Sequence, residues 1–244
     1  MSEFEYENLA GRVVLVTGGG SGLGEAICTA MTQADVRVAV VDISEAAAQR
    51  VASRLQGEGK DARPYAMDVA DEAAVVNTLK EIVGDMGPLD AIINNAGVDV
   101  TIGIEDMDSA DWHRVIATNL SGPFLLSKHG LPHLSSRGHI VNIASTAARR
   151  AWPNASAYHA SKWGLVGLTQ ALHAELRGRG IKVSAVIAGG MRTPFLLERF
   201  PDIDVDLLQD PMNVARTVRF LLTQPPETVI PEIMVLPMKE SSWP

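Results

Sequence analysis

Seven short runs of apolar residues recur along this chain, and segments with helical spacing separate them. Each run is six to eight residues long, and most are rich in Val, Ile and Leu. Such runs lack the alternating polar positions of a strand with one solvated face, so both faces are expected to be covered. The alternation predicts an α/β fold: a Rossmann-like, doubly wound parallel sheet of about seven strands with helices on both faces. The expected strands are 12–17, 36–42, 62–69, 89–95, 138–144, 181–187 and 230–236.

The segments between these strands carry helical patterns with recognisable ends. Ser44 is expected to cap a helix that runs to about Leu55, with Gly57 just past its end. Gly122 and Pro123 predict a bend inside the helical segment 111–133. The other expected helices are 22–34, 71–84, 155–177 and 211–223.

One segment, 192–209, fits the alternation of strands and helices poorly. It contains Pro194, Pro201 and several Asp residues. Long loops in compact folds usually have a function, so this segment is expected to form a lid over a substrate. No linker rich in Pro or Ser divides the chain, and residues 1–244 are therefore predicted to form a single domain.

Charge and cysteine content exclude several classes of protein. The chain has 21 Lys and Arg against 29 Asp and Glu, a net charge of −8, and no basic block. Nucleic acid and anionic membranes are therefore not expected as partners. No apolar run reaches the roughly 18 residues that a membrane helix needs, and residues 1–8 lack the apolar core of a signal peptide. The single cysteine, Cys28, excludes an internal disulfide and favours a cytoplasmic location.

Five glycines occur within seven residues, directly after the first expected strand and at the start of the first expected helix. Glycines at such a junction let the backbone turn sharply and bring its N–H groups close to a phosphate at the helix N-terminus. The spacing, Gly18-x-x-x-Gly22-x-Gly24, differs from the usual Gly-x-Gly-x-x-Gly dinucleotide fingerprint. A plain turn is the alternative interpretation. The loop residues assigned to cofactor binding are Gly18, Gly20, Ser21, Gly22, Leu23 and Gly24.

Asp42 ends the second expected strand, 18 residues after Gly24. An acidic side chain at this place can accept hydrogen bonds from both ribose hydroxyls and repels the additional phosphate of NADP. Ser21 and Ile43 stand where a 2′-phosphate needs an Arg or Lys. The sequence therefore predicts NAD in preference to NADP, with Asp42 and Ile43 among the cofactor-binding residues. The alternative is an Asp that only caps a turn beside Ser44.

Tyr158 and Lys162 lie four residues apart in one expected helix and therefore share a face. A lysine ammonium beside a phenol favours the phenolate and lowers its pKa, so Tyr158 is expected to exchange a proton near neutral pH. Such pairs also occur by chance, and a surface pair is the alternative. Ser145 favours the catalytic interpretation, because it follows the fifth expected strand at the sheet edge where open α/β folds bind ligands.

Together these motifs resemble those of the short-chain dehydrogenase/reductase family, in its single-domain branch, over roughly residues 10–237. The resemblance implies a catalytic tetrad of Asn119, Ser145, Tyr158 and Lys162. It also implies that residues 1–244 form one NAD-binding domain, which transfers a hydride between NAD(H) and a carbonyl or secondary alcohol. Further cofactor contacts that it implies are Asp68, Val69, Asn95, Ala96, Gly97, Tyr158, Lys162, Gly189, Met191 and Thr193, with Asn94 beside them.

The family mechanism implies a role for each member of the tetrad. Tyr158 exchanges a proton with the substrate oxygen, and Ser145 hydrogen-bonds that oxygen. Lys162 lowers the Tyr158 pKa and binds the nicotinamide ribose, while Asn119 positions a water that links Lys162 to solvent. The family also implies a homo-oligomer, a dimer or tetramer, with a homotetramer as the expected state. One departure is Ala188, which stands where the family usually has proline and is expected to loosen the turn that follows.

Three other interpretations are weaker. A non-catalytic NAD-binding regulator can share this fold, but it has no need of a tuned tyrosine. A sugar-nucleotide epimerase or dehydratase can share the Tyr-x-x-x-Lys pair, but the glycine spacing and the chain length argue against it. No metal site is expected, because His129 and His133 have Pro132 between them and lack the Glu of a His-Glu-x-x-His motif.

The loop that leads from Ser145 to Tyr158 contains Arg149, Arg150 and Trp152. We hypothesise that this loop shapes the pocket for a small alcohol or ketone substrate. An arginine at this place suits an anionic substrate. A plain surface loop is the alternative.

Overall fold

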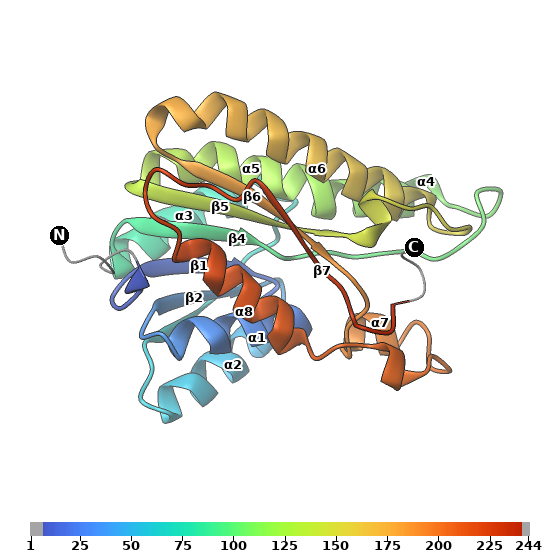
Figure 1. Cartoon of the computed structure of the whole chain (residues 1–244), viewed down its shortest axis with the longest axis horizontal. Helices are drawn as coiled ribbons and strands as arrows, with labels where there is room; N and C mark the ends of the chain where they lie inside the picture. Colours follow the sequence, from blue (N-terminus) through green and yellow to red (C-terminus); the bar gives the residue numbers. More distant parts are fainter. Residues whose placement is uncertain (1–6, 241–244) are drawn as a thin grey trace.

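The computed structural model describes residues 7–240, and residues 1–6 and 241–244 lie outside that part. Seven strands form one parallel sheet in the order β3-β2-β1-β4-β5-β6-β7 (Figure 1). This confirms the predicted α/β class and the doubly wound parallel sheet. The strands are β1 (Val13–Thr17), β2 (Arg37–Asp42), β3 (Ala62–Ala66), β4 (Leu89–Asn94), β5 (Leu134–Ser145), β6 (Lys182–Ala188) and β7 (Glu232–Val235).

Helices cover both faces of this sheet, as Figure 1 shows. One face carries α1 (Gly22–Thr32), α2 (Glu45–Gly57) and α8 (Pro211–Leu222) over one large apolar cluster. The opposite face carries α3 (Glu72–Met86), α5 (Gly122–Gly130) and α6 (Ser156–Leu176) over separate apolar clusters. Every residue of β1 is buried, which explains why the strands are apolar without alternation.

The carboxyl ends of the strands meet at one edge of the sheet. The direction of strand order reverses at β1, because β2 lies on one side of it and β4 on the other. Open α/β sheets bind ligands in the crevice at such a reversal. The loop that follows β1 and the residues that follow β4 and β5 therefore lie together at a place suited to a ligand.

The helical segment predicted for 111–133 is interrupted before the expected bend. Here α4 (Ser109–Ile116) passes into a π-helical turn at Ala117–Ser121, and α5 follows directly. Such turns interrupt the regular hydrogen-bond pattern and are common at functional sites. Asn119 lies buried in this turn, so the irregularity coincides with a residue predicted to be catalytic.

Three strands have an end that lies two or more residues from the predicted one. β3 ends at Ala66 instead of residue 69, so Asp68 and Val69 lie in the connection to α3. β5 starts at residue 134 instead of 138, and β7 covers only 232–235. The predictions followed composition, whereas strand ends depend on the neighbouring strand. β3 pairs only with β2, whose last residue, Asp42, lies opposite Ala66.

The segment 192–209 leaves the sheet and returns to the same place. It contains the short helix α7 (Pro194–Leu197) and a turn at Val205–Leu207. The backbone N–H of Arg192 donates to the carbonyl of Gln209 (2.9 Å), and the N–H of Gln209 donates to the carbonyl of Gly190 (3.1 Å). The ends of the segment are thus tied together, as in a compact Ω-loop.

Candidate active site

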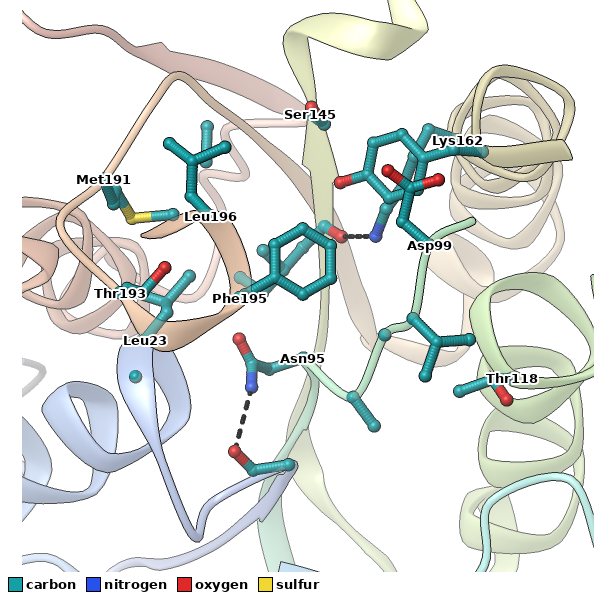
Figure 2. A pocket seen from close by; sticks show the side chains of 18 of the residues that line it. Leu23, Asn95, Asp99, Thr118, Ser145, Lys162, Met191, Thr193, Phe195 and Leu196 are labelled. Carbon is teal, nitrogen blue, oxygen red and sulfur yellow. Dashed lines mark hydrogen bonds between the residues drawn. The ribbon is translucent and has the colours of Figure 1, made fainter. Parts of the chain in front are cut away.

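A cavity of about 770 Å³ lies at the carboxyl edge of the sheet, against the segment 192–209 (Figure 2). Its volume is within the range of about 300–1,000 Å³ that is usual for ligand pockets. Three predicted residues, Gly20, Gly24 and Asn119, do not line it but support residues that do. The predicted residues that line it are Gly18, Ser21, Gly22, Leu23, Asp42, Ile43, Asp68, Val69, Asn95, Ala96, Gly97, Ser145, Tyr158, Lys162, Gly189, Met191 and Thr193.

The glycine loop forms a tight turn that side chains would obstruct. Gly18 has a φ of +62°, a backbone conformation that favours glycine. A Cβ added to Gly24 would lie 1.9 Å from the carbonyl oxygen of Gly18, so the first turn of α1 packs directly on the loop. The Asn95 side chain fixes this arrangement by donating to the carbonyls of Thr17 (2.9 Å) and Gly18 (3.3 Å). The loop therefore has the close backbone approach that a phosphate cradle needs.

Asp42 is held at the end of β2 by backbone hydrogen bonds. One carboxylate oxygen, Oδ2, accepts from the N–H of Gly20 (3.0 Å), and the other, Oδ1, accepts from the N–H of Ser44 (2.9 Å). A Cβ on Gly20 would lie 2.8 Å from Oδ2, so glycine is needed for this contact. Gly20 thus orients the carboxylate instead of lining the cavity, which explains its place in the loop.

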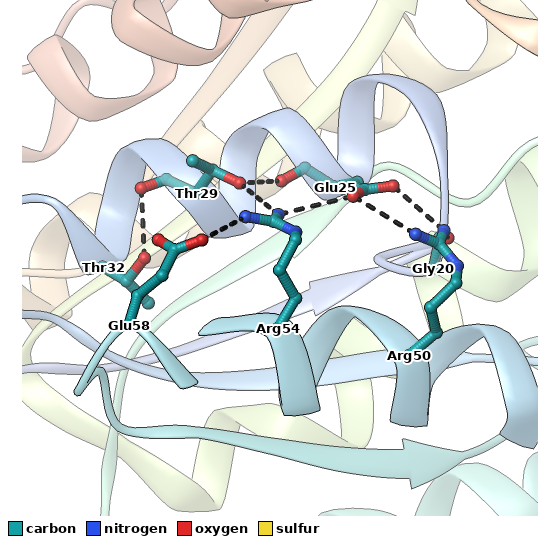
Figure 3. A network of polar contacts seen from close by, with 7 residues as sticks. All are labelled: Gly20, Glu25, Thr29, Thr32, Arg50, Arg54 and Glu58. Atoms are coloured by element: carbon teal, nitrogen blue, oxygen red, sulfur yellow. Dashed lines mark hydrogen bonds and ion pairs between the residues drawn. The ribbon is translucent and has the colours of Figure 1, made fainter. Parts of the chain in front are cut away.

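An ion-pair network braces the glycine loop from α2 (Figure 3). The guanidinium of Arg50 donates to the carbonyl of Gly20 (2.6 Å) and pairs with Glu25 of α1 (3.0 Å). Arg54 pairs with the same Glu25 (3.4 Å) and with Glu58 (3.0 Å). Arg50 is thus engaged by a carboxylate and a carbonyl, although it stands close to the loop.

Lys162 lies buried at the centre of the site, with a side chain from α6 that reaches β5. Its Nζ donates to the carbonyl of Ile143 (2.9 Å) and lies 5.6 Å from the centre of the Tyr158 ring. Burial lowers the pKa of Lys162 to about 8, and the nearby Asp99 carboxylate opposes this shift. A lysine with this pKa can lose or gain a proton near neutral pH.

The structure does not show the lowered Tyr158 pKa that the sequence predicted. Burial raises the Tyr158 pKa to about 12, because a desolvated phenolate is costly. A hydrogen bond with the Ser145 side chain lowers it, and the Asp99 carboxylate raises it. Lys162 is not among the causes, and its ammonium is directed to the carbonyl of Ile143. Sequence spacing predicted the shared helix face correctly but not the cost of burial.

Asn119 lies behind the cavity wall and holds the chain after β4. Its Nδ2 donates to the carbonyl of Val98 (2.8 Å), and its Oδ1 accepts from the N–H of the same residue (2.8 Å). Nδ2 also donates to the Ser161 hydroxyl (3.1 Å), which donates to the backbone carbonyl of Tyr158 (2.8 Å). Asn119 therefore joins the β4 loop to the helix that carries Tyr158 and Lys162. The water-positioning role stays a prediction.

A buried polar chain that the sequence analysis missed braces β4 against β5 and α6. The Asn94 side chain donates to Asn142 Oδ1 (2.7 Å), and Asn142 Nδ2 donates to the Thr169 hydroxyl (2.8 Å). Asn142 could have indicated this chain in the sequence, because it is an amide within the otherwise largely apolar run 138–144. Buried amides need partners, so these bonds fix the spacing of β4 and β5 below the cavity.

The segment 192–209 supplies one wall of the cavity. Phe195, Leu196, Arg199 and Phe200 line it. The ring of Phe195 lies 6.1 Å from that of Tyr158, between ring centres. The segment is thus placed over Tyr158.

The loop after Ser145 contributes one of its three singled-out residues to the cavity wall, and its role in shaping a substrate pocket stays a hypothesis. Trp152 lines the cavity, whereas Arg149 and Arg150 are not among the lining residues of the described chain. Arg149 pairs instead with Glu232 on β7. The positive groups that do line the cavity from outside the predicted set are Arg114, Arg199 and Lys239.

Two further searches cover residues 7–240 alone. In that part of the chain, no helix is long and apolar enough to cross a membrane. Within the same residues, no group of three or more His, Cys, Asp or Glu side chains is placed to hold a metal ion. His129, considered above as a ligand, lies 2.6 Å from Glu72.

Comparison with known proteins now adds to this geometry. The family model for short chain dehydrogenases matches residues 12–204. The chain belongs to the short-chain dehydrogenase family. A D-threitol dehydrogenase of Mycolicibacterium smegmatis is 38% identical over 186 residues, covering 75% of this chain and 71% of that protein. A 2-dehydro-3-deoxy-L-rhamnonate dehydrogenase (NAD(+)) of Sphingomonas is 33% identical over 210 residues, covering 85% of this chain and 82% of that protein.

Solved structures of short-chain dehydrogenases have the same fold. A metagenomic short-chain oxidoreductase in complex with NADP superposes with a TM-score of 0.84 at 30% identity, covering 95% of this chain and 99% of that one. The chain is therefore an oxidoreductase that transfers a hydride to or from a nicotinamide dinucleotide, in a family whose catalysis generally uses a tyrosine.

Proposed function

We propose that this chain is an NAD(H)-dependent dehydrogenase or reductase of secondary alcohols and their carbonyl counterparts, with Tyr158 as general acid and base. One observation carries the proposal. Ser145, Tyr158 and Lys162 line the same cavity as the glycine loop and Asp42. Asp42 and the glycine loop would hold a dinucleotide in the same cavity as the catalytic side chains, where its nicotinamide would supply or accept the hydride.

The described residues fit a nicotinamide dinucleotide. The loop is built for close backbone approach, since a Cβ at Gly24 has no room. Asp42 lines the cavity with its carboxylate held in place, while Ser21 and Ile43 offer no cation to a 2′-phosphate. Arg50 is paired with Glu25. These features support NAD, and the Sphingomonas relative is an NAD(+) dehydrogenase by name. A solved relative is in complex with NADP, and kinetics with both cofactors therefore test the preference.

The catalytic groups have distinct tasks in this proposal. With a pKa raised to about 12, Tyr158 is protonated at neutral pH and can donate its proton to a carbonyl oxygen. Ser145 hydrogen-bonds the Tyr158 side chain and can stabilise the same oxygen. Lys162, with a pKa of about 8, can return a proton to the site. A bound nicotinamide supplies or accepts the hydride. Phe195 lies beside the tyrosine ring, with 6.1 Å between the ring centres, and covers part of it.

Three further proposals accompany this function. The segment 192–209 acts as a substrate lid, supported by its tied ends and its lining residues. The protein forms a homo-oligomer, a dimer or tetramer, supported by the exposed Phe124 on α5 (46%) and Trp163 on α6 (51%). It acts in the cytoplasm, supported by its single, buried cysteine.

Steady-state kinetics with secondary alcohols and ketones test the proposed function. Each substrate is run with NAD(H) and NADP(H), using wild type, Tyr158→Phe and Asp42→Ala. We expect a higher kcat/KM with NAD(H), a loss of about 10²–10⁴-fold in Tyr158→Phe with cofactor binding retained, and a smaller NAD preference in Asp42→Ala. Turnover that survives Tyr158→Phe contradicts the catalytic assignment. Tight NADH binding without any turnover supports the regulator instead.

A further inference from the structure

Asp99 is a buried carboxylate in the active-site cavity to which neither the sequence analysis nor the mechanism assigns a task. It lies in the loop after β4, and its side chain is only 8% exposed. Oδ2 pairs with Arg199 (3.1 Å) and lies 3.4 Å from the Thr101 hydroxyl. Oδ1 is buried and has no hydrogen-bond partner in the described structure. A buried acceptor without a donor is costly, so it needs an explanation.

The unpartnered oxygen belongs to a side chain next to the catalytic groups. Asp99 lines the cavity together with Tyr158, and its charge acts on the pKa values of Tyr158 and Lys162. Figure 2 shows the Asp99 carboxylate in the same part of the cavity as Lys162 and Ser145. A group that hydrogen-bonds Asp99 is therefore close to the oxygen that Tyr158 protonates.

We propose that Asp99 is a specificity-determining residue that accepts a hydrogen bond from a second hydroxyl group of the substrate. The preferred substrate is then a polyhydroxylated alcohol or its hydroxyketone, in which a hydroxyl lies next to the reacting carbon. This inference rests on the proposed function, because it names the substrate class of the same site.

The surrounding charges favour a neutral hydroxyl over other ligands for Asp99. A carboxylate substrate would be repelled by Asp99 itself. An ammonium group would be repelled by the Arg199 guanidinium and by Lys162, which both interact with Asp99. A hydroxyl donates a hydrogen bond without adding charge, and a bond to a carboxylate is among the stronger ones in proteins.

The lid segment holds Asp99 ready for this bond. Arg199 donates to the backbone carbonyl of Asp99 (3.2 Å) as well as pairing with Oδ2, and its guanidinium lies 4.6 Å from the centre of the Phe195 ring. These contacts fix the carboxylate through Oδ2, whereas Oδ1 has no donor in the described structure. Burial raises the pKa of Asp99, and Arg199 opposes this by favouring the ionised form.

The test compares two ketones of one carbon skeleton, butan-2-one and 3-hydroxybutan-2-one. Their kcat/KM ratio is measured for wild type, Asp99→Asn and Asp99→Leu. We expect wild type to prefer the hydroxyketone, and the preference to fall in the order wild type, Asp99→Asn, Asp99→Leu. Loss of a hydrogen bond to a charged group corresponds to roughly 10- to 100-fold in this ratio.

Arg199→Gln serves as the matched control, because it breaks the ion pair but keeps the carboxylate. We expect it to lower the ratio less than Asp99→Leu does, because the carboxylate that accepts the hydrogen bond remains although Arg199 no longer holds it. An equal effect of Asp99→Leu on both ketones would mean that Asp99 only holds the lid and overturns the proposal. A wild-type enzyme that reduces butan-2-one in preference to 3-hydroxybutan-2-one also overturns the proposal. So does one that oxidises 3-hydroxybutanoate or 3-aminobutan-2-ol in preference to butane-2,3-diol. These wild-type results apply even where the variants do not fold.

A binding measurement separates this inference from the proposed function. Saturation-transfer NMR compares butane-2,3-diol with butan-2-ol on the protein in the presence of NADH. If no substrate is turned over, the dehydrogenase proposal fails, but a diol signal that is lost in Asp99→Leu still supports recognition by Asp99. Equal signals for both alcohols in wild type overturn it.

Discussion

Replacing Gly24 by alanine is expected to disturb the cofactor loop in a way that the structure quantifies. The added Cβ would lie 1.9 Å from the Gly18 carbonyl oxygen, 2.6 Å from its carbon and 2.7 Å from Asn95 Nδ2. Two of these three atoms are backbone and the third is held by two hydrogen bonds, so no flexible side chain can move aside. Overpacking of this kind costs about 1–3 kcal/mol.

The same substitution elsewhere should have the opposite sign. Gly84 lies inside α3, and a Cβ there would meet nothing within 4 Å. Gly84→Ala is therefore expected to stabilise the protein by about 0.5–1 kcal/mol through helix propensity alone. For a chain of this length, each kcal/mol changes Tm by about 2–4 °C.

Thermal unfolding followed by circular dichroism and fluorescence titration with NADH measure both effects. We expect Gly24→Ala to lower Tm and to weaken NADH binding, and Gly84→Ala to raise Tm with binding unchanged. A Gly24→Ala protein that melts and binds like wild type would refute the close approach of α1 to the loop. Equal losses in both variants would show that the effect is not specific to the loop.

Two other substitutions test the buried groups. Thr169→Val leaves Asn142 Nδ2 without its acceptor and should lower the free energy of unfolding by about 1–3 kcal/mol. The control Thr217→Val removes only a bond to the Asn213 carbonyl on the surface of α8 and should change the free energy of unfolding by less than about 0.5 kcal/mol. Equal effects of the two substitutions in urea unfolding would contradict a role of the buried polar chain in stability. The Lys162 pKa falls from 10.5 unfolded to about 8 folded, so the unfolded chain binds more protons between these values and stability rises with pH in that window. From pH 8 to 10.5, the free energy of unfolding of wild type should therefore rise relative to that of Lys162→Met by an amount on the order of 3 kcal/mol. If urea unfolding shows the same pH dependence for both proteins in this range, Lys162 is not desolvated.

The sequence predicted the features that depend on local pattern. Apolar runs predicted the sheet, because a strand covered on both faces needs nonpolar side chains at every position. The glycine loop, Asp42 and the Tyr158–Lys162 pair were found because a turn, a strand end and a helix face each fix spacing over a few residues. The placement of these groups around one cavity follows from the strand order, which right-handed connections restrict to a few possibilities.

The structure alone decided the contacts between distant segments. Arg199 hydrogen-bonds Asp99 across 100 residues of sequence, and Arg149 pairs with Glu232 instead of entering the cavity. The Tyr158 pKa likewise depends on burial, which outweighs the neighbouring charges. Such effects depend on which side chains the folded loops bring together and on how much water they displace. The spacing of residues along the chain predicts neither the contacts between distant side chains nor their desolvation, because both arise only when separate elements pack against one another.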